Sequence, residues 1–246
     1  MKLTVVGCAG SFPSAQSPAS SYLVEHDGQR IVLDMGNGAL GSLQRFTDIY
    51  QIDAVVLSHL HIDHFVDLGS YYVARKYHPE GSAGPIPVYG PDDTAARVVA
   101  AYGLQSTADI AGELDVRPLA AKFEIGAFTI ETTRMVHPIE AYAIRVSADG
   151  RSLTYSGDTG PTPELITAAR DTNLALFEGS FVTDPSNPRD LHLSAAEAGA
   201  HARAAGAERL VVTHLVPWND QEQVHAEAVA EFPGAQVASV GLTIEV

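Results

Sequence analysis

The sequence predicts an α/β fold in which helices pack outside two β-sheets, and two observations support this prediction. β-branched or alternating runs, broken by Gly, Pro and Asp, make the first part of the chain rich in strands, at residues 3–6, 20–26, 29–35 and 52–58. The last third alternates between apolar strand-like runs and helical patterns, which is typical of βα units. No linker rich in Pro, Gly or Ser interrupts the chain, so residues 1–246 are expected to form one domain.

The remaining elements follow in order. Helical patterns and turn residues predict helices at 39–48, 64–77 and 92–103, and a loop at 79–87. Strands are expected at 128–136, 142–147 and 151–156, with short turns between them. The alternating last third predicts a helix at 164–170, a strand at 174–179, a helix at 194–206, a strand at 208–214, a helix at 221–232 and β-like structure at 235–246.

Composition excludes several classes of protein. Hydrophobic residues make up 46% of the chain and charged residues 18%, which is globular rather than disordered composition. The net charge is −15, with 30 acidic and 15 basic residues, so binding of extended nucleic acid through a basic face is not expected. The single cysteine, Cys8, cannot form an intrachain disulfide, which favours a reducing, cytoplasmic location. No apolar segment has transmembrane length, so no membrane partner is expected.

Residues with metal-ligating side chains follow four of the predicted strands. His59, His61, Asp63 and His64 crowd into the stretch LSHLHIDHF, directly after the apolar run AVVL. Three further candidates each follow a strand of their own: His137, Asp158 and His214. Imidazole and carboxylate suit a borderline divalent ion such as zinc. Seven such residues at four strand ends indicate a metal site more strongly than the alternative of a solvated turn.

These motifs resemble the metallo-β-lactamase superfamily, whose pattern is HxHxDH followed by a distant His, an Asp and a final His. The resemblance implies an αββα sandwich with two mixed sheets and helices outside. It implies two divalent ions, with zinc expected and manganese or iron also tolerated. The implied ligands are His59, His61 and His137 for one ion, Asp63, His64 and His214 for the second, and Asp158 between both. Asp34 matches the superfamily's early aspartate, which usually supports the ligand loop, although a plain turn residue before Gly36 is the alternative.

The segment at 176–199 resembles the ribonuclease Z-like branch of that superfamily. By this resemblance, His192 would protonate the leaving oxygen and Glu178 would orient the His192 ring. Asp63 is the third catalytic candidate. The alternative is that His192 is only a loop residue before a helix. That helix is expected to begin at Ser194, with Glu197 completing an S-x-x-E capping box.

The substrate expected from these resemblances is a small phosphodiester. Ribonuclease Z usually carries a long tRNA-gripping arm between the single metal His and the bridging Asp, but His137 and Asp158 are only 21 positions apart and a hairpin fills the interval. Over the whole chain, stretches such as SPASSYLV, YSGDTG, DLHLSAAEAG and VVTHLVPW resemble actinobacterial-type cyclic-nucleotide phosphodiesterases. The implied reaction is hydrolysis of a 3′,5′-cyclic nucleotide to the 5′-monophosphate, with a metal-bridging hydroxide as nucleophile. The alternatives are a ribonuclease Z-like nuclease or another hydrolase of this fold, such as a lactonase or thioesterase.

Some expectations concern binding surfaces. Related enzymes are often dimers, so the resemblance also allows a homodimer. Tyr71, Tyr72 and Tyr77 follow the metal loop and could stack on a purine, although packing against the sheet is the commoner role of such residues. Trp218 lies four residues after His214, where it could border the pocket or pack inside.

Overall fold

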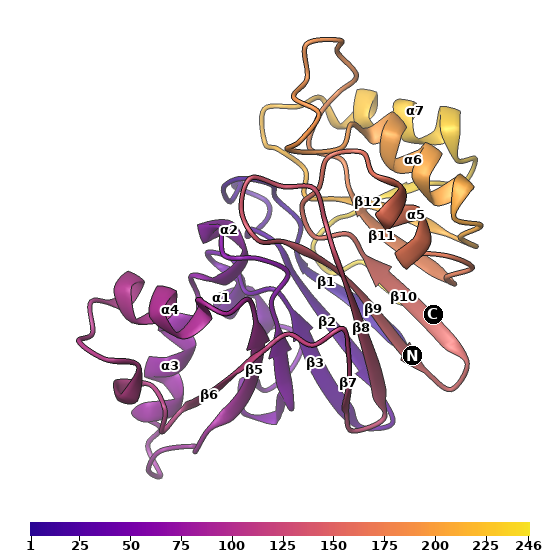
Figure 1. Cartoon of the computed structure of the whole chain (residues 1–246). Helices are drawn as coiled ribbons and strands as arrows, with labels where there is room; N and C mark the ends of the chain where they lie inside the picture. The colour runs from indigo at the N-terminus through magenta and orange to yellow at the C-terminus, as the bar shows by residue number, and fades with distance from the viewer.

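Two seven-stranded β-sheets face each other in the computed structural model, which describes residues 1–246. Both sheets are mixed: the first has the strand order β14-β1-β2-β3-β4-β5-β6 and the second β13-β12-β11-β10-β9-β8-β7. Helices α1 to α4 lie outside the first sheet, and α5 to α7 lie outside the second (Figure 1). The αββα architecture predicted from the sequence is confirmed.

The bounds of the elements are as follows. The first sheet contains β1 (Lys2–Gly7), β2 (Ser21–His26), β3 (Gln29–Leu33), β4 (Ala54–Val56), β5 (Ile86–Gly90), β6 (Leu114–Pro118) and β14 (Thr243–Glu245). The second contains β7 (Lys122–Ile125), β8 (Phe128–Arg134), β9 (Tyr142–Ala148), β10 (Arg151–Tyr155), β11 (Leu174–Glu178), β12 (Leu210–Thr213) and β13 (Gln236–Val237). The helices are α1 (Ala39–Leu43), α2 (Ile62–Phe65), α3 (Leu68–Lys76), α4 (Thr94–Tyr102), α5 (Pro163–Ala168), α6 (Ala195–Ala204) and α7 (Gln221–Glu231). Short 3₁₀ turns occupy Ile49–Gln51 and Thr107–Asp109.

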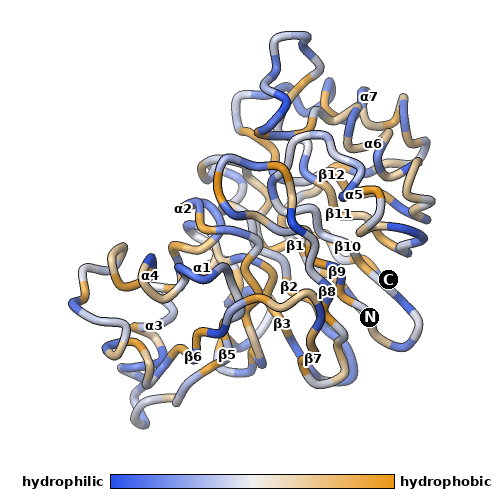
Figure 2. Tube along the Cα trace, in the orientation of Figure 1, coloured by the Kyte–Doolittle hydropathy of each residue, from blue (hydrophilic) through white to orange (hydrophobic).

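Strand periodicity explains why the first sheet packs on both faces. Val5 and Val56 belong to the larger hydrophobic cluster, which also contains the strands of the second sheet, whereas their neighbours Val6 and Val55 pack with α1, α3 and α4. Successive side chains of a strand point to opposite faces, so each apolar run in this sheet contributes to both layers. Hydrophobic colour accordingly concentrates along the central strands in Figure 2, and the connecting loops are mostly hydrophilic.

The structure corrects several predicted boundaries. The helix predicted at 64–77 is two helices, α2 and α3. The break lies at Asp67, whose amide donates to Met35 O and whose carboxylate accepts a hydrogen bond from Leu40 N. The helix predicted at 39–48 ends at Leu43. β5 begins inside the predicted loop, at Ile86, and β6 and β7 lie in a stretch for which no strands were predicted. No helix combines the length and apolar character needed to cross a lipid bilayer.

Candidate metal centre

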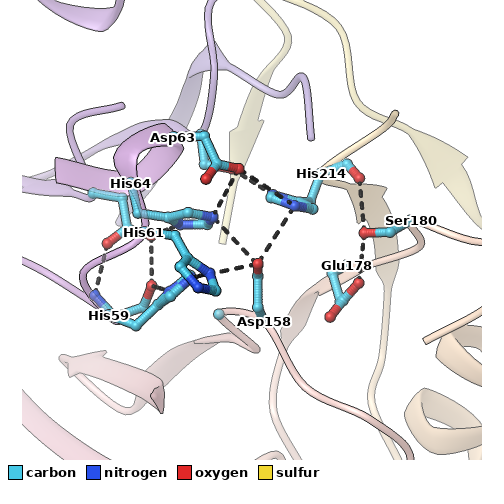
Figure 3. Close-up of polar contacts among 12 residues, drawn as sticks. His59, His61, Asp63, His64, Asp158, Glu178, Ser180 and His214 are labelled. Carbon is cyan, nitrogen blue, oxygen red and sulfur yellow. Dashed lines mark hydrogen bonds and ion pairs between the residues drawn. The ribbon is translucent and has the colours of Figure 1, made fainter. Parts of the chain in front are cut away.

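The seven predicted ligand side chains converge where strands of both sheets end. His59, His61, Asp63 and His64 follow β4 of the first sheet, whereas His137, Asp158 and His214 follow β8, β10 and β12 of the second. Figure 3 shows the side chains of the loop after β4 pointing toward Asp158 and His214. The structure therefore brings together all seven candidate ligands, at the ends of strands from both sheets.

One group of possible ligands contains His59, His61, His137 and Asp158, whose ligand atoms all lie within 4.8 Å of one another. Nδ1 of His61 is 3.2 Å from Nε2 of His59 and 3.1 Å from Nε2 of His137. Asp158 Oδ2 lies 3.5 Å from His59 Nε2. These four side chains could hold one metal ion.

A second group contains Asp63, His64 and His214. Asp63 Oδ2 lies 3.4 Å from His64 Nε2 and 3.7 Å from His214 Nε2. The Asp158 carboxylate faces this group as well, because its Oδ1 is 3.4 Å from His64 Nε2 and its Oδ2 is 3.5 Å from His214 Nε2. Asp158 thus lies between the two groups and can contribute an oxygen to each.

The chemistry of these atoms fits divalent metal ions. His64 Nε2, Asp158 Oδ1 and His214 Nε2 are buried and have no hydrogen-bond partner, which costs free energy unless another group pairs with them. Ligand atoms about 2.0–2.1 Å from a tetrahedral ion lie about 3.3–3.4 Å apart, close to most of the separations found here. Burial lowers the pKa of His59 and His214, which favours the neutral imidazole that coordinates a metal.

Asp34 holds the loop after β4 in place through hydrogen bonds to Ser58 and His64. Its buried carboxylate accepts hydrogen bonds from Ser58 N at 2.6 Å, Ser58 Oγ at 2.7 Å, His64 Nδ1 at 2.7 Å and Tyr155 Oη at 2.8 Å. Its φ of 57° is left-handed, a conformation that Asp tolerates better than most residues. A plain turn aspartate would not be buried with four hydrogen bonds, so the role that the resemblance gave to Asp34 agrees with the structure.

His59, His137 and His214 are oriented through their Nδ1 atoms. Nδ1 of His59 lies 3.0 Å from Ser58 Oγ, whose proton goes to Asp34. His137 donates from Nδ1 to Leu191 O at 2.9 Å, and Nδ1 of His214 is 2.9 Å from Ser20 Oγ. Each bond leaves Nε2 directed at the centre of the site, which fixes both the tautomer and the ring orientation.

His192 and Glu178 form a pair beside the metal centre. His192 Nδ1 lies 3.1 Å from Glu178 Oε1 and 3.9 Å from Asp158 Oδ2. Glu178 is fully buried and accepts hydrogen bonds from Thr159 N and Ser180 Oγ, both at 2.7 Å. Burial alone would lower the pKa of His192, but the adjacent Glu178 carboxylate outweighs it and raises that pKa to about 9. His192 can therefore hold a proton at neutral pH.

Comparison with known proteins places this site in a family. A family model described as "Beta-lactamase superfamily domain" matches residues 29–215, which include all seven possible ligands. The chain belongs to the beta-lactamase superfamily.

Relatives in this superfamily span almost the whole chain. An uncharacterized protein of Mycobacterium tuberculosis is 42% identical over 243 residues, covering 95% of this chain and 88% of the relative. The probable metallo-hydrolase YhfI of Bacillus subtilis is 32% identical over 248 residues, covering 100% of this chain and 100% of the relative. Its crystal structure superposes with a TM-score of 0.88, covering 100% of this chain and 98% of that chain at 27% identity. A ribonuclease Z of Myxococcus xanthus is 28% identical over 303 residues, covering 100% of this chain and 97% of the relative.

Three supporting residues of this superfamily site were not singled out from the sequence: Ser20, Ser58 and Tyr155. Ser58 directly precedes His59, and that position next to a ligand is a signal that could have identified it. Ser20 and Tyr155 precede or end strands without any distinguishing pattern. Their roles depend on contacts with residues more than 100 positions away, which the sequence does not reveal.

The loop that carries Asp34 is packed too tightly against Asp63 for a side chain at Gly36. A Cβ at this position would lie 1.9 Å from Asp63 O and 2.6 Å from Asp63 C. We expect Gly36→Ala to lower the free energy of unfolding by roughly 1–3 kcal/mol through overpacking, and to reduce bound metal. Urea unfolding and metal analysis measure both effects. Gly41→Ala is the control, because nothing lies within 4 Å of its added Cβ in α1; equal effects of the two substitutions would contradict the prediction.

Proposed function

We propose that this protein is a two-metal-dependent phosphodiesterase that hydrolyses 3′,5′-cyclic nucleotides to 5′-monophosphates. The broader class to which it belongs is the metallo-hydrolases of the beta-lactamase fold, which are related to ribonuclease Z. The observation that carries the proposal is the combination of two groups of possible ligands, both faced by Asp158, with the His192–Glu178 pair beside them, in which Glu178 is buried and His192 is partly buried.

In this proposal, His59, His61 and His137 hold one ion, Asp63, His64 and His214 hold the other, and Asp158 serves both. Zinc suits this His-rich set, although manganese or iron would also be tolerated. When bound, such a pair of ions supplies positive charge for a phosphoryl group and an activated water. Asp63 contributes to catalysis through its place in the second group, where its carboxylate faces His64 and His214.

His192 is the proposed proton donor to the departing 3′ oxygen. Its Nδ1 is bonded to Glu178, so Nε2 is the nitrogen that remains to transfer a proton. The Glu178 carboxylate raises the pKa of the ring, which favours the protonated form that a general acid needs. Glu178 holds the ring in place and is itself fixed by Thr159 N and Ser180 Oγ, so the pair is rigid before substrate arrives.

The short chain between His137 and Asp158 favours a small substrate. β9 and β10 form a hairpin in this interval, with no space in the chain for an arm that grips tRNA. The net charge of −15 also disfavours a large polyanion. The relationship to a ribonuclease Z nevertheless supports a second candidate, a ribonuclease Z-like nuclease. A lactonase or a thioesterase is a further alternative within the fold.

A substrate panel tests the proposal. Metal-loaded protein is expected to hydrolyse cyclic AMP or cyclic GMP as well as bis(p-nitrophenyl) phosphate. Cleavage of the synthetic diester without either cyclic nucleotide would restrict the function to a general phosphodiesterase. Cleavage of precursor tRNA would favour the nuclease, and turnover of a lactone or thioester alone would exclude phosphodiester chemistry.

Replacement of His192 by alanine separates its proposed role from a structural one. Natural alkoxide leaving groups need a proton, whereas p-nitrophenolate leaves without one. We therefore expect His192→Ala to slow cyclic-nucleotide hydrolysis by roughly 10²–10⁴-fold and to slow p-nitrophenyl ester hydrolysis far less. Steady-state rates on both substrates measure the difference. His225→Ala, at an exposed position of α7, is the matched control; an equal loss on both substrates would show that His192 is not the acid.

A further inference from the structure

Two exposed aromatic rings lie together on two segments that adjoin His214. Phe12 and Trp218 have ring centroids 5.2 Å apart and planes inclined by 41°, yet the two residues are 39% and 73% exposed. Large aromatic side chains usually bury most of their surface, so an exposed pair is a marker of binding.

The backbone contacts next to these rings include His214 itself. A Cβ at Gly10 would lie 2.8 Å from His214 Cδ2 and 2.5 Å from His214 O, so Gly10 packs directly on this possible ligand. Phe12 N donates to Gly10 O at 2.7 Å, and Trp218 lies four residues after His214. Phe12 is thus two residues from Gly10, which packs on His214, and Trp218 is four residues from His214 itself.

The two segments are held rigidly against each other. Leu215 N donates to Cys8 O at 2.7 Å and Gly10 N donates to Leu215 O at 3.0 Å. The turn that carries Trp218 is closed by Asn219 N donating to Val216 O, and Asn219 Nδ2 also donates to Ser180 O at 2.7 Å. An exposed ring on a fixed backbone loses little conformational freedom when it binds a ligand.

The same segments are uncharged, although the chain as a whole is strongly acidic. Residues 8–19 and 214–219 contain no Asp, Glu, Lys or Arg, although the whole chain has 30 acidic residues. Neither segment therefore carries a carboxylate that would repel an anionic substrate. Exposed aromatic rings on uncharged segments that adjoin His214 match a ligand with a flat aromatic part and an anionic part.

We propose that Phe12 and Trp218 form a stacking platform for the base of a nucleotide whose phosphate lies at the metal centre. This inference rests on the proposed function and extends it, because the platform would select substrates that carry a nucleobase over other phosphodiesters. Stacking on aromatic side chains is tolerant of base identity, so purines and pyrimidines would both be accepted, with the larger purine surface favoured.

Trp218 is an intrinsic fluorescence probe of this surface, because it is the only tryptophan in the chain. Titration of the metal-loaded protein with adenosine 5′-monophosphate is expected to quench tryptophan fluorescence saturably, whereas ribose 5-phosphate, which lacks the base, should bind more weakly and leave the emission unchanged. Trp218→Ala and Phe12→Ala should each weaken adenosine monophosphate binding by roughly five- to a hundredfold in calorimetry. Trp218→Phe should keep most of the affinity, and Tyr102→Ala, at a residue that is 46% exposed at the end of α4, is the control.

The outcomes separate this inference from the function on which it rests. Equal affinity for the two phosphates, without quenching, would overturn the platform and leave phosphodiester hydrolysis intact. Absence of binding by either phosphate, together with inactivity on every phosphodiester, would overturn both. A fluorescence change that depends on protein concentration rather than on nucleotide would show that the rings pack against a second copy of the chain, which also overturns the platform.

Discussion

Asp158→Ala is expected to reduce hydrolysis of cyclic nucleotides and of bis(p-nitrophenyl) phosphate by on the order of 10³-fold or more. Asp158 faces both ligand groups, so its removal affects both proposed ions at once. It also leaves His64 and His214 without the carboxylate that lies 3.4–3.5 Å from their Nε2 atoms. Steady-state rates, measured together with the metal content of each preparation, test this expectation.

Two further variants make the result specific. Asp158→Asn keeps the shape of the side chain but loses its charge, so it should fold and still lose most activity. Asp92→Ala removes an exposed aspartate before α4 and should behave like the unaltered protein. Full activity in Asp158→Ala would rule out the two-metal mechanism.

Removal of metal by a chelator is expected to lower the melting temperature by roughly 5–10 °C. A ligand present at about 100 times its dissociation constant stabilises the folded state by about 2.7 kcal/mol, and about 1 kcal/mol shifts the melting temperature of a 150–250-residue protein by about 2–4 °C. The physical reason lies in the buried, unpartnered atoms of His64, Asp158 and His214, which lose their partner without metal. Differential scanning calorimetry before and after chelation measures the shift.

Restoring single metals completes this experiment. Addition of zinc, manganese or iron to the chelated protein should recover the melting temperature to different extents, and the best ion indicates which metal the site prefers. His61→Ala should retain a smaller shift on chelation, because the second ligand group is unaltered. A chelator that leaves the melting temperature unchanged would contradict metal binding at this site.

The candidate ligand residues could be picked out from the sequence because a local pattern carries them. An apolar strand followed by His or Asp is visible in the chain, and strand ends of a two-sheet fold gather at one edge. His59, His137, Asp158 and His214 each follow such a strand, and the structure brings them together. The capping box of Ser194 and Glu197 was equally local, and it is present at the start of α6.

Features that depend on distant contacts were not predictable. The helix pattern at 64–77 gives no sign of the break at Asp67, which follows from hydrogen bonds to Met35 and Leu40. Tyr71 and Tyr72 are buried, so packing is the role that the structure supports, whereas the exposure of Trp218 could not be inferred from its position four residues after His214. In each case tertiary context overrides what the local pattern indicates.

The origin of the ligands in both sheets has a kinetic consequence. The first and last possible ligands, His59 and His214, are separated by 155 positions, and both lie 3.5 Å from Asp158 only once the two sheets have docked. Contacts of such high sequence separation form late, so they are absent from the early part of folding. Ions held here would therefore slow unfolding far more than they accelerate folding. Metal loading would then protect the protein chiefly by lengthening the lifetime of its native state.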